Sequence, residues 1–336
     1  MVAAGGCALA LALSLSGCGS AGSQDAGTDD AGQAADAPAT QDGPAGEAKD
    51  PEYHAPAPAA EAATPTKDAP TPAGALRPPA DGAPVSAAQL RGVISQHIGD
   101  YAVAYADAAG AWEVGVALDT PHVSASVIKL AVAGAFLERS AQGDFPLDAQ
   151  VTIDAGDVVG GTGVVQNSGA GSTWTYRELV QHMISDSDNT ATNVLIDAIG
   201  LPAVNDYATR NGLDNTKLNR KMMDFSTDEQ NYTSAHDVAA MLRMIYGGTF
   251  VNADMSALMM DALKAQSDTS GIDEGLPDGL VFAHKTGTLD TVKNDAGIIL
   301  DGHPRILVVL GQDVTEAGAQ SCMTDLGKLV VWGDER

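Results

Sequence analysis

The chain has 336 residues, of which 44% are hydrophobic and 18% are charged, enough for one large domain or two small ones. Its formal net charge is −26, from 44 acidic and 18 basic side chains, which argues against nucleic-acid binding because such a field repels phosphate backbones. The cysteines are Cys7, Cys18 and Cys322, too few and too far apart for a disulfide framework or a cysteine metal site.

A short apolar stretch opens the chain. Residues 8–15 (ALALALSL) are too few to span a bilayer and are typical of a secretory signal. The following Leu15-Ser16-Gly17-Cys18 resembles a bacterial lipobox, which implies a lipidated N-terminus at Cys18. We therefore expect a lipoprotein signal peptide over 1–18 and an extracytoplasmic protein anchored to a bacterial cell membrane. The alternative is an ordinary signal peptide and a secreted protein.

Residues 19–84 differ in composition from the rest of the chain. They contain 11 of the 16 prolines, 11 acidic and 3 basic residues, and Tyr53 as their single aromatic. Such a segment buries too little apolar surface to offset chain entropy. It is predicted to be a disordered tether that holds a folded domain, residues 85–336, away from the membrane.

The remainder has globular patterning. Two strands are predicted over 101–105 and 112–116, joined by a turn over 107–110. Helices are predicted where apolar residues recur at helical spacing, over 127–137, 176–184, 189–199 and 237–246. Gly200 and Pro202 are expected to close the third of these helices. Three strands, over 281–286, 296–300 and 306–310, precede a last helix over 320–331. Strands at both ends with helices between them predict an α+β domain whose sheet joins the two termini.

The first candidate catalytic motif is Ser126-Val127-Ile128-Lys129, at the start of a predicted helix. Serine and lysine three residues apart lie on one helix face, so the amine can approach the hydroxyl. A serine hydroxyl needs a base to accept its proton, and lysine is such a base when burial or a neighbouring cation lowers its pKa. The backbone N–H groups at the helix start can bind a developing oxyanion. Taken alone, the motif describes an ordinary surface serine and lysine equally well.

The second motif is Ser187-Asp188-Asn189, between two predicted helices. A hydroxyl there can relay protons to a leaving nitrogen, and the Asn189 amide can hold a substrate amide. The same three residue types are also favoured as plain helix caps.

The third motif is Lys285-Thr286-Gly287-Thr288, at the end of an apolar strand. Lys285 and Thr286 offer a charge and a hydroxyl to a carboxylate, and Gly287 lets a substrate backbone approach closely. The backbone N–H of Thr288 can complete an oxyanion hole with that of Ser126. The alternative is a strand that ends in a turn with an exposed lysine.

Together, in this order, the three motifs are the signature of class A β-lactamases and penicillin-binding proteins. The chain resembles this penicillin-recognising serine enzyme family over most of residues 95–333, most clearly in 124–130, 183–196 and 297–300. The resemblance implies a β-lactamase/transpeptidase-like fold, with an antiparallel sheet from both termini flanked by helices. It also implies a helical subdomain over about 126–246 and an active site in the cleft between the two parts.

The resemblance also implies residue roles. Ser126 is expected to be the acylated nucleophile, Lys129 a proton acceptor or shuttle, and Ser187 a proton relay. Asn189 is expected to bind the substrate side-chain amide, and Lys285 the substrate carboxylate. Contacts with substrate at the strand edge are expected from Thr286, Gly287 and Thr288.

One feature departs from the family pattern. Class A β-lactamases hydrolyse the acyl-enzyme with a water activated by the glutamate of a Glu-x-x-Leu-Asn loop, which residues 218–225 lack. Met222 falls near the glutamate's position, and methionine neither accepts a proton nor holds a polarised water. We therefore expect acylation without fast deacylation. Asp224, Asp228 or Glu229 would replace the glutamate from a rearranged loop, or are solvated loop acids.

Three functions remain open: a serine hydrolase acting on β-lactams or related amides, a D,D-peptidase acting on cell-wall peptides, and a slowly deacylating penicillin-binding or sensor protein. No metal or cofactor is expected, because the seven histidines form no His-x-His or His-Glu-x-x-His pair, and His284 is expected to be a strand residue. The expected partner is a small-molecule β-lactam or a peptidoglycan peptide, bound by a monomer.

Overall fold

The computed structural model describes residues 84–333. The predicted signal peptide, Cys18 and all but the last residue of the predicted tether lie outside the described residues. Every helix within residues 84–333 is too short or too polar to span a bilayer.

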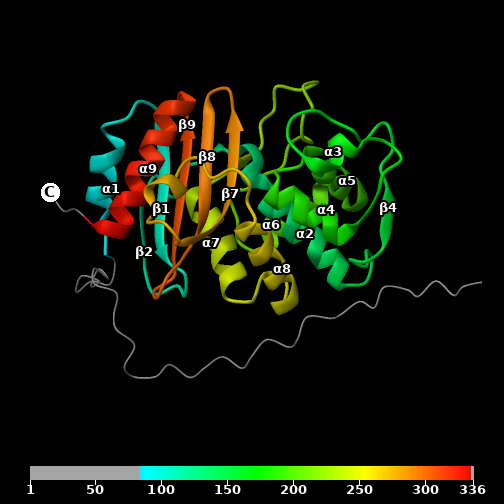
Figure 1. The fold of residues 1–336 in the computed structure, drawn as a ribbon, viewed down its shortest axis with the longest axis horizontal. Coiled ribbons are helices and arrows are strands. Elements are labelled where there is room, and N and C mark those ends of the chain that lie inside the picture. The colour runs from blue at the N-terminus through cyan, green and yellow to red at the C-terminus, as the bar shows by residue number, and fades with distance from the viewer. Residues whose placement is uncertain (1–83, 334–336) are drawn as a thin grey trace, which may run out of the picture. The chain divides into compact units, whose positions relative to one another are not determined.

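A five-stranded antiparallel sheet joins the two ends of this region. Its order is β2-β1-β9-β8-β7, so the N-terminal strand β1 lies beside the C-terminal strand β9 (Figure 1). The strands are β1 (Asp100–Asp107), β2 (Glu113–Val116), β7 (Val281–Leu289), β8 (Val292–Leu300) and β9 (Arg305–Gln312). The predicted α+β fold with a sheet from both termini is therefore confirmed.

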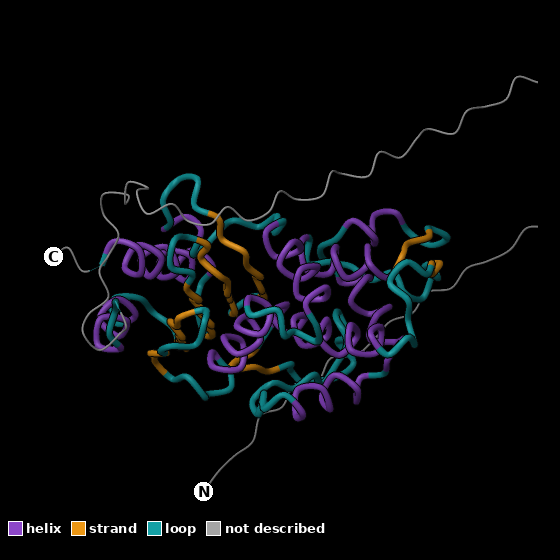
Figure 2. The backbone as a smooth tube through the Cα atoms, turned by 90° about the horizontal axis from the view of Figure 1, so that it is seen from below, coloured by secondary structure: helices purple, strands orange, loops and turns teal. Residues whose placement is uncertain are grey.

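Side chains alternate between the two faces of the sheet, as a strand buried on both faces requires. On β1, Tyr101, Val103 and Tyr105 belong to one buried cluster, whereas Ala102 and Ala104 belong to another. The first face is covered by α1 (Ala87–Ile94) and α9 (Glu316–Trp332). The second is covered by α7 (Ala235–Tyr246) and α8 (Ala253–Lys264), so helices flank the strands on both sides (Figure 2).

The helical part lies beyond the second face. It consists of a 3-10 turn η1 (Ala125–Ile128), α2 (Lys129–Ala141), α3 (Val164–Ser168), α4 (Tyr176–Ser185), α5 (Asn189–Ile199) and α6 (Leu201–Arg210). Two short strand pairs support it, β3 (His122–Val123) with β6 (Tyr232–Thr233) and β4 (Gln150–Thr152) with β5 (Thr173–Thr175). Another 3-10 turn, η2 (Asp273–Gly275), leads from α8 towards β7.

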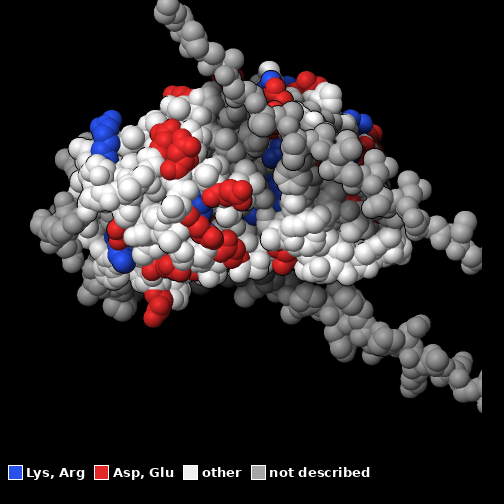
Figure 3. Space-filling model, turned by 90° about the horizontal axis from the view of Figure 1, so that it is seen from above, with Lys and Arg blue, Asp and Glu red and all other residues white. Residues whose placement is uncertain are grey.

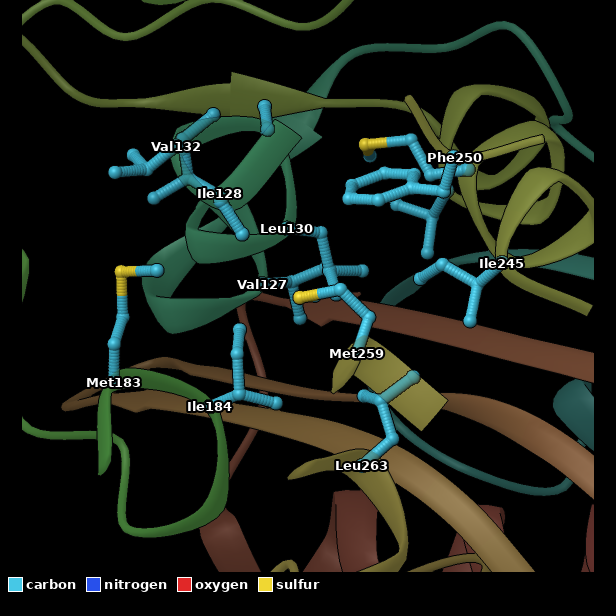
Figure 4. Close-up of a cluster of buried hydrophobic side chains, with 14 of the residues drawn as sticks. Val127, Ile128, Leu130, Val132, Met183, Ile184, Ile245, Phe250, Met259 and Leu263 are labelled. Carbon is cyan, nitrogen blue, oxygen red and sulfur yellow. The ribbon is translucent and has the colours of Figure 1, made fainter. Parts of the chain in front are cut away.

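One apolar cluster joins the helical part to the sheet. Val127, Ile128 and Leu130 from η1 and α2 are fully buried with Ile184 of α4 and Met259 of α8 (Figure 4). Burial of each such side chain stabilises the fold by roughly 1.5–3 kcal/mol. The turn that carries the first motif is thus held by the core directly beneath it.

Several elements differ from the sequence prediction. Gly200 ends α5 as expected, but α6 begins at Leu201 with Pro202 in its first turn, where a proline needs no N–H partner. The helices α1, α3 and α8 were not predicted. Strand β7 continues to Leu289, beyond the predicted end at Thr286, because its pairing with β8 runs to the hairpin turn.

Candidate active site

Ser126 lies in the 3-10 turn η1, directly before α2. In such a turn residues i and i+3 eclipse each other, which places the side chains of Ser126 and Lys129 on one side. Ala125 has a φ of +43°, a strained value for a residue with a side chain, and Ser126 directly after it is partly exposed. Ser126 lines a pocket of about 180 Å³.

Lys129 is fully buried and is held by three oxygen atoms. Its Nζ lies 2.6 Å from the Ser187 carbonyl oxygen, 3.2 Å from Ser187 Oγ and 2.9 Å from Asn189 Oδ1. Burial, and next the positive charge of Lys285, hold the pKa of Lys129 well below its ordinary value of 10.5. This environment favours the neutral amine, while the role of Lys129 as proton acceptor stays a prediction.

Ser187 occupies the link between α4 and α5 and has a φ of +53°. The next residue fixes this link: the Asp188 carboxylate caps α5 by accepting from Ala191 N at 2.8 Å and also accepts from Val165 N at 2.7 Å. The helix cap and the candidate proton relay are therefore parts of one local structure. Thr162 adds a hydrogen bond from its hydroxyl to the Ser187 carbonyl oxygen.

The Asn189 amide is held at both ends. Its Oδ1 accepts from Lys129 Nζ, and its Nδ2 donates to the Gly160 carbonyl oxygen at 3.1 Å. Gly161, with a φ of +96°, passes so close that a Cβ there would collide with Asn189 Nδ2. An amide oxygen has two lone pairs, so Asn189 Oδ1 keeps one acceptor site, while its binding of the substrate side-chain amide stays a prediction.

Strand β7 brings the third motif against the first. β7 is the edge strand, and a Cβ on Gly287 would lie 2.8 Å from the Ser126 backbone nitrogen and 3.1 Å from the Ala125 Cβ. The glycine thus permits contact between β7 and η1. Thr288 lines the same pocket as Ser126, while the joint oxyanion-hole role of their N–H groups stays a prediction.

Lys285 is fully buried beside this edge, and its Nζ donates to the Thr286 carbonyl oxygen at 2.8 Å. Burial lowers the pKa of Lys285 to about 7, against the opposing effect of nearby carboxylates. Figure 3 shows basic atoms inside a hollow of the surface, while acidic side chains are spread over its outside. Burial thus brings Lys285 close to its neutral form, and its binding of a substrate carboxylate stays a prediction.

Met222 lies at the pocket, where the missing glutamate was expected. Asn193 of α5 clamps its backbone, accepting from Met222 N at 2.9 Å and donating to Met222 O at 3.0 Å. The Met222 side chain is 8% exposed and lines the Ser126 pocket. The residue at this place therefore offers a thioether and no proton acceptor.

The three acidic residues of the loop, Asp224, Asp228 and Glu229, lie outside the Ser126 pocket. Asp224 accepts from Ser226 Oγ at 2.6 Å and from Ser226 N at 2.9 Å, which lowers its pKa. Asp228 and Glu229 are exposed. Among residues 84–333, none of the three lines the Ser126 pocket, so the structure supports the alternative that they are solvated loop acids.

Other residues line the pocket without having been predicted. Met223, Phe225 and Leu289 give it an apolar rim, and Phe225 is 76% exposed. Arg220 also lines it, with its guanidinium held by Glu229 O and Gln230 Oε1. An exposed phenylalanine in a polar loop was the sequence signal that could have indicated this rim.

The described residues contain no group of three His, Cys, Asp or Glu side chains placed to hold a metal ion. His284 lies in β7, as predicted, and its Nδ1 is 2.8 Å from Asp295 Oδ1. The other described histidines are distributed over separate elements.

Comparison with known proteins agrees with this geometry. The family model described as "Beta-lactamase enzyme family" matches residues 86–332. The extended-spectrum β-lactamase PER-1 of Pseudomonas aeruginosa is 29% identical over 212 residues, which cover 57% of this chain and 68% of that protein.

Two solved structures show the same architecture. An ancestral class A β-lactamase aligns with a TM-score of 0.68 and 27% identity, over 73% of this chain and 98% of that chain. A β-lactamase from Sphaerobacter thermophilus aligns with a TM-score of 0.68 and 24% identity, over 73% of this chain and 96% of that chain. The second match bears on the fold alone.

Proposed function

The chain thus belongs to the β-lactamase enzyme family, and from this premise we propose that it is a serine hydrolase that β-lactams acylate on Ser126. The observation that carries the proposal is the environment of Lys129, a fully buried amine among Ser187 and Asn189 oxygens. A neutral amine has two N–H donors and one lone pair. The donors suit Ser187 O and Asn189 Oδ1, which leaves the lone pair for a hydroxyl proton.

The chemistry follows from this arrangement. Ser126 Oγ attacks the lactam carbonyl carbon while its proton passes to Lys129. The backbone N–H groups of Ser126 and Thr288 stabilise the oxyanion. When the C–N bond breaks, the ring nitrogen takes a proton from Ser187 Oγ, and Lys129 returns its proton to Ser187 across the 3.2 Å contact. The product is an ester on Ser126 with the ring opened.

The substrate carboxylate belongs beside β7 in this proposal. Lys285 is buried there with a backbone carbonyl as its hydrogen-bond partner, and an incoming carboxylate would favour its protonated form and pair with it. The Thr286 side chain adds a hydroxyl at the same edge. Both features support an anionic substrate.

Met222 favours a second candidate over rapid β-lactam hydrolysis. Met222 places a thioether where the catalytic glutamate was expected, and none of the described residues that line the pocket is an aspartate, glutamate or histidine able to activate a deacylating water. A slowly deacylating penicillin-binding protein, or a D,D-peptidase acting on cell-wall peptides, uses the same acylation step. Release of D-alanine from a peptide ending in D-Ala-D-Ala would identify the peptidase.

The deciding experiment follows the intact mass of the full chain over time with benzylpenicillin, alongside Ser126→Ala. We expect the wild type to gain the mass of one whole β-lactam and to keep it, and the variant to gain nothing. Free enzyme with accumulating hydrolysed drug would show true turnover and contradict the slow step. No adduct and no hydrolysis would contradict β-lactam chemistry altogether.

We also propose that the protein is extracytoplasmic and lipid-anchored through Cys18, on the strength of its lipobox-like sequence. Cys18→Ser should move the protein from the membrane fraction to the soluble fraction of expressing bacteria. An unchanged distribution would favour an ordinary signal peptide or another anchor.

A further inference from the structure

The Ser126 pocket contains a charged side chain that the proposed chemistry does not use. Of the described residues that line the pocket, Arg220 alone carries a charge at pH 7. Lys285, the proposed anchor of the substrate carboxylate, is fully buried and is not among the lining residues. Arg220 is partly exposed and lies just before Met222 in the chain. The positive charge at the rim therefore needs a role of its own.

Three acceptors hold the Arg220 guanidinium in place. Its Nε donates to Glu229 O at 2.9 Å, its Nη1 to Lys221 O at 3.3 Å and its Nη2 to Gln230 Oε1 at 3.1 Å. A guanidinium has five N–H donors, so each terminal nitrogen keeps one N–H beyond the hydrogen bonds made within residues 84–333. Two donors on one fixed cation suit the two oxygens of a carboxylate.

The charge of Arg220 is not neutralised within the described part of the chain. Most other arginines there form ion pairs with carboxylates, but Arg220 forms none. The neighbouring Lys221 pairs with Asp197. Asp224 accepts two hydrogen bonds from Ser226, which are the main cause of its lowered pKa, whereas Arg220 and Lys221 contribute least to it. Arg220 is thus available to an anion that enters the pocket.

The loop that contains Arg220 lies beside Asn189, the residue proposed to bind the amide of the substrate's acyl group. Asn193, one turn further along α5, holds the backbone of this loop through both ends of its amide. A Cβ on Gly161 would lie 2.4 Å from Asn189 Nδ2 and 3.5 Å from Met223 Sδ. An acyl group held at Asn189 therefore has the loop as its neighbour.

Apolar side chains adjoin the guanidinium. Four of them line the same pocket: Met222, Met223, Phe225 and Leu289. The guanidinium carbon of Arg220 lies 6.0 Å from the centroid of the Phe225 ring, and Phe225 is 76% exposed. An acyl group that matches this surface is apolar along its length and ends in a negative charge.

We propose that Arg220 is a specificity-determining residue for the acyl part of the substrate, and that the pocket favours acyl groups with an apolar chain ending in a carboxylate. This inference rests on the proposed acylation of Ser126. Since the substrate's other carboxylate is proposed to lie beside Lys285, the favoured substrate is a dianion. Arg220 takes no part in making or breaking bonds and acts by binding the acyl chain.

The test uses penicillins whose acyl chain ends either in a carboxylate or in the primary amide of the same shape. Glutaryl, adipyl and pimelyl chains give three such pairs and cover a range of reach from Asn189. Intact mass of the full chain gives the second-order rate constant of adduct formation, and the acid/amide ratio is taken for each pair. For the best pair we expect the ratio to be about tenfold higher in the wild type than in Arg220→Gln, near the lower end of what a hydrogen bond to a charged group contributes.

Matched variants separate this role from a general effect of charge. Arg91→Gln removes the same charge from an exposed position on α1 outside the pocket and should leave the ratio unchanged. Arg220→Lys keeps the charge without the guanidinium fork and should retain part of the preference. Gln230→Glu places a carboxylate where Arg220 Nη2 already donates, so it should neutralise the guanidinium and lower the ratio. If Arg220→Gln does not fold, the ratios of Arg220→Lys and Gln230→Glu decide.

Equal ratios in the wild type and in Arg220→Gln would overturn the role of Arg220 while leaving the proposed acylation in place. An equal fall in Arg91→Gln would also overturn it, because the cause would then be the net charge of the protein. A wild type that forms no adduct with benzylpenicillin or with any of these acids and amides would overturn the proposed function, and this inference with it.

Discussion

At the residue scale, the pKa of Lys129 depends on the charge of Lys285 as well as on burial. Both lower the pKa of Lys129, so the amine is neutral at a pH where an exposed lysine is charged. The proposed base and the proposed anchor of the substrate carboxylate are thus coupled, although they lie on different elements.

The coupling predicts a pH profile. Because the pKa of Lys129 is lowered, acylation should rise with pH and reach its plateau well below pH 10.5. Lys285→Gln removes a neighbouring positive charge and should raise the pKa of Lys129. The acylation rate should then rise at a higher pH than in the wild type. Adduct formation with benzylpenicillin methyl ester measures this without the carboxylate contact. An unchanged pH dependence in Lys285→Gln would show that burial alone lowers the pKa of Lys129.

Met222 is the residue that should decide the lifetime of the adduct. Its backbone is clamped by Asn193, so Met222→Glu would place a carboxylate at the pocket in a fixed position. General-base catalysis contributes about 10²–10⁴-fold, and we expect the adduct to disappear at least about 100-fold faster in this variant.

Intact mass after removal of excess drug gives the adduct lifetime. Ile98→Glu is the matched control, since Ile98 is 90% exposed and is not among the residues that line the Ser126 pocket, so it should leave the lifetime unchanged. If the adduct disappeared faster by the same factor in both variants, the cause would be a general charge effect. If it disappeared no faster in Met222→Glu, the missing glutamate would not be the reason for slow deacylation.

At the element scale, the site depends on the contact of the edge strand β7 with the turn η1. Gly287 permits this contact, because a Cβ there would press on the Ser126 backbone nitrogen at 2.8 Å. The two elements cannot separate without moving the backbone N–H of Thr288 relative to that of Ser126, the two proposed oxyanion donors.

Gly287→Ala should therefore impair catalysis more than folding. We expect acylation to fall about 100-fold, the usual result of misplacing reactive groups by 1 Å, and stability to fall by about 1–3 kcal/mol through overpacking. Adduct formation and thermal melting measure the two effects. Gly302→Ala, in a turn with open space around it, should change neither. An unchanged acylation rate in Gly287→Ala would mean that β7 and η1 can move apart slightly without loss of catalysis.

Sequence patterns predicted the elements with strong periodicity and missed those held by their surroundings. β1, α5 and α7 were found because their apolar residues repeat. Helix α6 was missed because Gly200 and Pro202 signal an end as strongly as a beginning. The position of Met222 followed from the motif pattern, whereas its two hydrogen bonds with Asn193 depend on contact between distant segments, which no local pattern contains.

At the scale of the whole molecule, the first strand and the last strand of the described chain are neighbours in the sheet, and the C-terminal helix α9 packs on them. Strand β1 pairs with β9 along its full length, and α9 packs on β1 and β9 through residues that include Cys322. The thiol of Cys322 is fully buried, and burial raises its pKa to about 12.

The reactivity of Cys322 should show whether α9 stays packed on the sheet. In the native protein at pH 8 we expect alkylation of Cys322 by iodoacetamide to be at least about 100-fold slower than in denaturant, because the thiolate is the reactive form. Peptide mass mapping distinguishes Cys322 from Cys7 and Cys18. Rapid native labelling would show that α9 separates from the sheet without global unfolding.

The loop that carries Met222 is closed at its base by one side chain. Asn231 accepts from the backbone nitrogens of Asn219 and Arg220 at 2.8 and 3.0 Å and donates to Arg220 O at 3.1 Å. With both ends fixed there, residues 223–228 can vary while Glu229 and Gln230 keep their contacts with Arg220 at the base. Natural selection, or a randomised library, can therefore alter the rim that substrates meet at little cost to folding, which makes this loop the place where new substrate preferences would arise first.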